Sequence, residues 1–237
     1  MNLRSILTGT LALGLLSLSA QAGFHFMQIE EIIGGIGGDA NAQAVQLRLR
    51  TGGQNIVSAS RLKAWDATGA NPVLLLDITT NVSNSAGGAN VLLTTPAFNS
   101  LMAGVPGYST DFTLAQPIPA SYLSGGKVTF EDDGGTIYWS VAFGAYTGTN
   151  LGSATNDADG NFGAPFGGPL PTGGLQGIRF TGAFGALSTT NAADYALTPS
   201  PATVRNNAGT SFTVVPEPAS AALLGLGILA LARRRRQ

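Results

Sequence analysis

The chain has 237 residues, a formal net charge of −1 at pH 7, and only 11% charged residues, against about 25% in an ordinary domain. It contains no cysteine, which excludes a thiol nucleophile, a thiolate zinc site and an iron–sulfur cluster. Between residues 23 and 213, seven basic residues stand against twelve acidic ones, a net charge of −5. A nucleic-acid partner is therefore not expected, because nucleic-acid-binding surfaces are basic.

The first 22 residues have the layout of a secretory signal peptide. Arg4 supplies the positive start, residues 6–18 are apolar, and Ala20 and Ala22 frame a small-residue cleavage site. We expect signal peptidase to cut after Ala22. The alternative, a permanent N-terminal anchor, is disfavoured because the apolar run is short for a bilayer and ends in a cleavage pattern.

Short strands separated by turn residues are predicted in the first half of the chain. Residues 24–33 and 45–50 should pair as a hairpin across the glycine-rich loop at 34–39. The second strand alternates, so that Val45, Leu47 and Leu49 would face a core while Gln46, Arg48 and Arg50 would face water. Further strands are expected at residues 60–67, 73–79 and 90–94.

The second half begins with the clearest hairpin, residues 127–131 and 136–143 around the turn at 132–135. One more strand is expected at 178–180. Residues 144–177 are rich in Gly, Pro, Asn and Asp, and we expect a partly ordered, ligand-facing surface loop there. Seven or so short strands and no long amphipathic helix predict an all-β fold, a two-sheet antiparallel sandwich of the immunoglobulin type over residues 23–213.

The segments "FHFMQIEEIIGG", "AVQLRLRTGGQN", "LKAWDATGANP", "VAFGAYTG" and "AADYALTPSPATVRNN" occur in this order. In this order they resemble the bacterial lamin-tail-like domains, over most of residues 23–207. The resemblance implies an immunoglobulin-like β-sandwich in a secreted or surface protein, acting as an interaction or architectural module. It implies no catalytic residues.

Candidate chemistry is sparse. The only histidine is His25, which has no G-x-S-x-G partner and is expected to be a strand residue. The carboxylates that could form a hydrolytic pair are Glu131, Asp132, Asp133, Asp157, Asp159 and Asp194. The run at 132–133 is explained by a hairpin turn, so no enzyme is predicted and a secreted carboxylate-dependent hydrolase stays the alternative.

No metal or cofactor is predicted. The loop "NDADGN" offers oxygen ligands from Asp157, Asp159 and Asn161, but it departs from the calcium-binding EF-hand loop because its glycine comes early and no glutamate closes it. Calcium therefore stays an alternative for this loop. The run "GGIGG" lacks the last glycine of a dinucleotide-binding fingerprint and precedes a strand rather than a helix.

The C-terminal segment, residues 214–237, ends in an apolar run at 219–232 and the cluster Arg233, Arg234, Arg235 and Arg236. A helix over the apolar run would be about 21 Å long, a marginal span for a bilayer core of about 30 Å. The arginines would stay on the cytoplasmic side and leave the domain outside the inner membrane. Before the span, Pro216, Glu217 and Pro218 form a stiff extended segment suited to recognition by a protease.

The stretch "VPEPASAALLGLGILALARRRR" resembles the PEP-CTERM sorting signal of Gram-negative bacteria. The resemblance implies recognition of Pro216, Glu217 and Pro218 by an exosortase, a membrane-embedded cysteine transpeptidase. We therefore expect an exported protein that passes through the inner membrane to the cell surface or the extracellular matrix, with a structural, adhesive or binding role in envelope, exopolysaccharide or biofilm. The alternative is a periplasmic binding module that stays anchored in the membrane.

Overall fold

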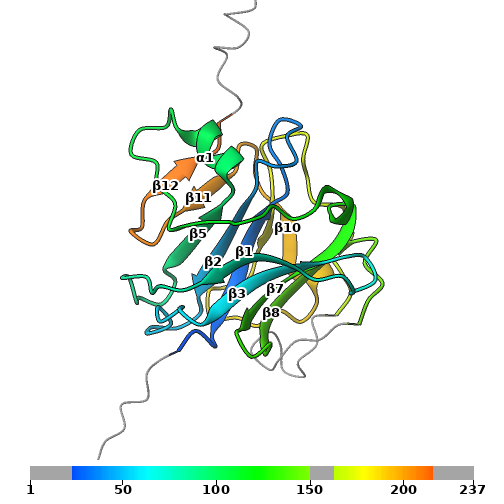
Figure 1. Cartoon of the computed structure of the whole chain (residues 1–237), viewed down its shortest axis with the longest axis horizontal. Coiled ribbons are helices and arrows are strands. Elements are labelled where there is room, and N and C mark those ends of the chain that lie inside the picture. The colour runs from blue at the N-terminus through cyan, green and yellow to red at the C-terminus, as the bar shows by residue number, and fades with distance from the viewer. Residues whose placement is uncertain (1–22, 150–162, 216–237) are drawn as a thin grey trace, which may run out of the picture.

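The computed structural model describes residues 23–149 and 163–215, and this part of the chain is mostly β-structure (Figure 1). Its strands are β1 (Met27–Ile33), β2 (Ala44–Leu49), β3 (Ser60–Trp65), β4 (Val73–Ile78), β5 (Asn90–Thr94), β6 (Phe112–Thr113), β7 (Gly125–Asp132), β8 (Ile137–Gly144), β9 (Ile178–Phe180), β10 (Tyr195–Leu197), β11 (Thr203–Arg205) and β12 (Ser211–Thr213). Its helices are the short α1 (Pro96–Met102) and α2 (Asn191–Asp194), with a 3-10 turn η1 at Ala120–Tyr122.

Two sheets face each other across one apolar core. The larger has the strand order β10-β9-β1-β2-β5-β6, and the smaller has the order β4-β3-β7-β8. The larger sheet contributes the alternating side chains of β2, Val45, Leu47 and Leu49, as the period of two predicts. The smaller contributes Phe130 from β7 and Trp139 from β8. The all-β prediction is confirmed at this level.

Both predicted hairpins are confirmed. Strands β1 and β2 pair antiparallel from Met27↔Leu49 to Ile33↔Ala44, and β7 pairs antiparallel with β8. A register shift between Ile29 and Glu31 marks a bulge in β1. Because a bulge adds one residue, the inward face moves from odd to even positions, so that Ile32 rejoins the core that Ile29 occupies.

A third layer covers the outer face of the larger sheet. Helix α1 and the hairpin β11–β12 lie together on the side of β5, away from β3, β7 and β8 (Figure 1). They form a second apolar cluster with outward side chains of the sheet: Ile33, Ile36, Ala42, Ala44, Leu92, Phe98, Leu101, Met102, Ala202, Val204, Phe212 and Val214. The sheet is therefore buried on both faces, which explains why every residue of β5 is buried.

This layer changes the expected exposure of β2. Gln46 was expected to face water, yet it is buried and its Oε1 accepts a hydrogen bond from the backbone N–H of Arg205 in β11. Arg48 is mostly shielded and pairs with Glu30, with 3.1 Å between Nη1 and Oε1. Two further differences are the parallel pairing of β5 with β6 and the helix α1, whose N-terminus is capped by the hydroxyl of Thr95.

Candidate functional site

The C-terminal end of the described residues is part of the hydrophobic core. After β12, Val214 is fully buried in the second apolar cluster, and its backbone N–H donates to the carbonyl of Ala202 at 2.9 Å. Val215 packs against the same cluster and is half-buried. The segment predicted to be a sorting signal from residue 214 onward therefore begins inside the folded body.

A polar clamp fixes the turn of the β11–β12 hairpin to the larger sheet. One carboxylate oxygen of Asp111 accepts from the backbone N–H groups of Leu92 and Asn207, each at 2.7 Å. The Asn207 side chain accepts from the N–H of Asn84 at 2.7 Å and donates to the carbonyl of Asn90 at 2.9 Å. Burial raises the pKa of Asp111, and the two backbone hydrogen bonds oppose that shift. The clamp is a structural device that seats the C-terminal hairpin.

Several predicted site residues lie outside the described residues. These are Ala20 and Ala22 of the signal peptide, Asp157, Asp159 and Asn161 of the calcium alternative, Pro216, Glu217 and Pro218, and the cluster Arg233, Arg234, Arg235 and Arg236. The apolar run at 219–232 lies outside them as well. Within the described ranges, no helix has the length and apolar character needed to cross a membrane.

The carboxylates around the β7–β8 turn are held by neighbouring groups. Glu131 is buried between two cations of β3, with Oε1 at 2.7 Å from Nε of Arg61 and at 2.5 Å from Nζ of Lys63. Asp132 accepts from the backbone N–H of Thr136 at 2.8 Å and from the hydroxyl of Tyr138 at 3.0 Å. This is the hydrogen bonding of an Asp that closes a turn, as predicted.

Asp194 and His25 each contact neighbouring groups of the fold. One Asp194 carboxylate oxygen accepts from the backbone N–H groups of Thr189 and Thr190, at 2.6 Å and 3.0 Å, and so holds the start of α2. His25 stacks on Tyr138 with 4.6 Å between ring centroids, in the turn before β1 rather than in a strand. Among residues 23–149 and 163–215, no three His, Asp or Glu side chains are grouped as metal ligands.

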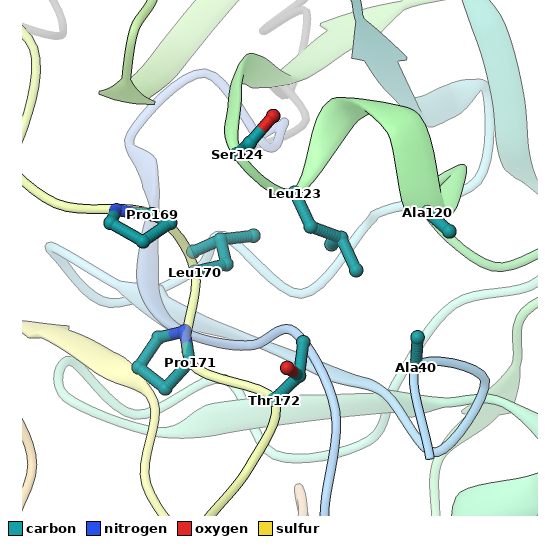
Figure 2. Close-up of a pocket in the computed structure, with 8 residues that line it drawn as sticks. All are labelled: Ala40, Ala120, Leu123, Ser124, Pro169, Leu170, Pro171 and Thr172. Carbon is teal, nitrogen blue, oxygen red and sulfur yellow. The ribbon is translucent and has the colours of Figure 1, made fainter. Parts of the chain in front are cut away.

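The predicted ligand-facing loop lines a surface cleft. Figure 2 shows the cleft, of about 440 Å³, whose walls come from the loop at 34–43, from η1 and the residues after it, and from the loop at 144–177. Leu123 and Leu170 are buried at its base, where the N–H of Leu170 donates to the carbonyl of Leu123 at 2.9 Å. Leu170 thus ties the described end of the long loop to the body, and the cleft presents small apolar groups and few polar ones: Ala40, Ala120, Leu123, Ser124, Pro169, Leu170, Pro171 and Thr172.

A second cavity is lined by Arg50, which the alternation of β2 predicts to be exposed to solvent. Arg50 follows β2 and is only 7% exposed. It lines a pocket of about 380 Å³ together with Phe26, Thr51 and Gly185. Burial lowers the pKa of Arg50 to about 10, so the guanidinium stays charged at neutral pH. Alternation along β2 treats Arg48 and Arg50 alike, so no local pattern in the sequence distinguishes this residue.

Comparison with known proteins identifies the C-terminal segment and leaves the body unassigned. Residues 214–236 match the family model of the PEP-CTERM protein-sorting motif. No curated protein matches the chain. The chain therefore carries, from the buried Val214 onward, the sorting motif of exported proteins that an exosortase directs to the cell surface.

Proposed function

We propose that this protein is exported, held briefly in the inner membrane by residues 219–236, and cleaved near Pro216 by an exosortase that delivers the β-body to the envelope, exopolysaccharide or extracellular matrix. The observation that carries the proposal is the sorting motif at 214–236. The layout of residues 1–22 supports it, because export is the step that must precede sorting.

The position of the motif on the body supports cleavage without loss of structure. The described core ends at Val214, and only half-buried Val215 follows it in the same cluster. A cut at Pro216 or beyond therefore leaves the second apolar cluster and the β11–β12 pairing complete. The removed part is a temporary handle, and the delivered part is a folded domain.

We propose further that the body is an immunoglobulin-like, lamin-tail-like module with a structural, adhesive or binding role. Two facing sheets with a shared core support this identity. The parallel β5–β6 pair and the third layer are additions that such a module would have to accommodate. A non-catalytic role is supported by the engagement of Glu131, Asp132 and Asp194 in ion pairs and turn hydrogen bonds.

Mass spectrometry of the surface-exposed protein tests the sorting proposal. We expect a species that starts at Gly23, ends near Pro216 and lacks the arginine cluster. A double substitution, Pro216→Ala with Pro218→Ala, should keep the full-length chain in the inner membrane. Ser220→Ala, a neighbouring change that leaves the triplet intact, is the control and should be processed normally.

The same experiment separates this proposal from a permanently anchored binding module. An anchored module would keep residues 233–237 on the mature species, and replacement of the two prolines would not change its location. An intact C-terminus on the surface-exposed wild-type protein would therefore overturn the proposed processing.

A further inference from the structure

Arg50 is a buried cation whose counter-ion is missing from the described protein. Its Nε and Nη2 atoms are buried and donate to no partner, and no described carboxylate pairs with it. The ion pair between Arg179 and Glu31 in the larger sheet shows how the same edge of a guanidinium binds a carboxylate. In Arg179 the same two nitrogens, Nε and Nη2, donate to one oxygen of Glu31 at 2.7 Å and 2.5 Å.

Two aromatic rings hold the Arg50 guanidinium in place. Its central carbon lies 5.5 Å from the centroid of Phe26 and 5.4 Å from the centroid of Trp139. Cation–π contacts of this kind offset part of the desolvation of a buried guanidinium, but they do not satisfy its N–H donors. The backbone is also fixed, because the N–H of Arg50 donates to the carbonyl of Phe26 at 2.8 Å. The group is thus pre-positioned and retains unused donors.

The pocket around this cation has walls of three kinds. Phe26 is 47% exposed, so a large part of its ring faces solvent. Thr51 is an exposed residue that carries a hydroxyl, and Gly185 adds a wall without a side chain. The Nε–Nη2 edge itself has almost no exposed surface, so a ligand that pairs with this edge has to displace a side chain that covers it.

These features select the chemistry of the ligand. A single guanidinium with a free two-donor edge matches one carboxylate, whereas a phosphate would call for more positive charge. An exposed aromatic face suits a ring with C–H groups, and a neighbouring hydroxyl suits a ligand that carries hydroxyls. The volume of about 380 Å³ admits one such ring. We propose that this pocket binds a hexuronate, the carboxylate-bearing sugar unit of an acidic polysaccharide, with Arg50 as its counter-ion.

This inference deepens the binding role proposed for the body and rests on it, but it is independent of sorting because the site lies within the body. The body has a net charge of −5, so long-range attraction does not assist an anionic ligand. We therefore expect a weak, local interaction with a dissociation constant of about 1–10 mM for a single sugar unit.

The test uses the full chain in detergent micelles and observes the ligand by saturation-transfer NMR, with sodium glucuronate and glucose as probes at matched ionic strength. We expect saturation of the glucuronate ring protons and at least about tenfold weaker signal with glucose, because glucose lacks the charged partner of the guanidinium. Absence of transfer to glucuronate, or equal transfer to both sugars, would overturn the assignment.

Three variants locate the interaction. Arg50→Gln should abolish the glucuronate signal, and Arg50→Lys, which keeps the charge but loses the two-donor edge, should weaken binding by about tenfold. Arg205→Gln removes the same charge at an exposed position of β11 and should bind as the wild type does. Near-ultraviolet circular dichroism confirms that each variant is folded. Folded Arg50→Gln that binds glucuronate normally would refute the role of Arg50, and failure of all binding would leave the C-terminal processing of the surface protein unaffected.

Discussion

Lys127 is a lysine whose ammonium group has been withdrawn from water. Lys127 is only 3% exposed, and its Nζ lies 4.9 Å from the ring centroid of Trp65 and 5.7 Å from that of Tyr146. Burial lowers the pKa of Lys127 from 10.5 to about 8, and the charge of Glu131 opposes the shift. The aromatic contacts stabilise the charged form without restoring its hydration.

Stability should consequently rise with pH between about 8 and 10.5. In this window the unfolded state keeps the Lys127 proton while the folded state loses it, so the free energy of unfolding increases. Urea unfolding at pH 7.5 and 9.5 should show a gain of about 2 kcal/mol for the wild type. Lys127→Met, which fills a similar volume without a titrating group, should lose that gain. The same gain in both proteins would assign it to another group.

Ala59 adopts a backbone conformation that costs free energy. Its φ is 70°, in the left-handed region, and the residue is exposed in the turn before β3. An L-residue with a Cβ is disfavoured there by about 1–2 kcal/mol, whereas glycine is not. The strain is maintained because the N–H of Ala59 donates to Ile78 and its carbonyl accepts from Asp133.

Ala59→Gly should therefore stabilise the protein. We expect a gain of about 0.5–1 kcal/mol, since the relief of strain exceeds the extra entropy that glycine has in the unfolded chain. Ala103→Gly is the matched control: Ala103 is also exposed, but its φ is −58°, so glycine should be neutral or destabilising there. Chemical denaturation of both variants measures the difference, and a loss of stability in Ala59→Gly would contradict the strain.

At the scale of elements, the β11–β12 hairpin depends on the polar clamp at its turn. Two strands of three residues each are too short to be stable alone. Asn207 is 3% exposed, and its amide group connects the hairpin to Asn90 of the larger sheet and to Asn84 in the loop before β5. The clamp and the apolar contacts of Val204 and Phe212 together seat the hairpin.

Asn207→Ala should cost about 2–3 kcal/mol, because it leaves the buried carbonyl of Asn90 and the part-buried N–H of Asn84 without this partner. Asn81 provides the comparison: its side chain also accepts a backbone hydrogen bond, from Ser58 at 2.9 Å, but it is exposed. Asn81→Ala should therefore cost less than about 1 kcal/mol, since water replaces the lost bond. Equal losses in the two variants, measured by urea unfolding, would show that the clamp has no special role.

Three of the predicted strands rest on alternating apolar residues. Residues 45–50, 60–67 and 136–143 carry a period-two pattern, and β2, β3 and β8 lie there with ends shifted by one or two residues. Strands β6, β10, β11 and β12 are two or three residues long, too short for a period to be visible. Helix α1 was missed for a similar reason, since it has seven residues and its start at Thr95-Pro96 follows a strand directly.

Candidate sites made of consecutive residues can be predicted from the sequence, whereas sites assembled from distant residues cannot. The sorting segment is a contiguous pattern, so residue order alone reveals Pro216, Glu217 and Pro218. The turn role of Asp132 is also local. The Arg50 pocket is assembled from residues 26, 50, 51 and 185, and the strand β11 that hydrogen-bonds Gln46 lies more than 150 positions away in the chain. Contacts at such separations leave no trace in one sequence.

At the scale of the whole molecule, the body and the sorting motif share residues 214 and 215. The motif begins at residue 214, which is a core residue of the third layer, and the boundary expected between residues 213 and 214 therefore cuts through that core. Under the proposed processing, the delivered protein must keep every residue on which its core depends. The position of Val214 two residues before Pro216 meets that requirement.

C-terminal truncation tests where the folded body ends. A chain that ends at Val215 should have the melting temperature of the full-length protein, whereas one that ends at Thr213 should melt about 4–8 °C lower, because about 2 kcal/mol of Val214 burial is lost. Val214→Ala should reproduce most of that loss by leaving a cavity, and Val215→Ala, at a half-buried position, should cost much less. Scanning calorimetry of the four chains measures these differences. Equal melting temperatures for the chains ending at residues 213 and 215 would mean that Val214 does not anchor the C-terminus, and processing would then be free to cut upstream of Pro216 without a cost in stability.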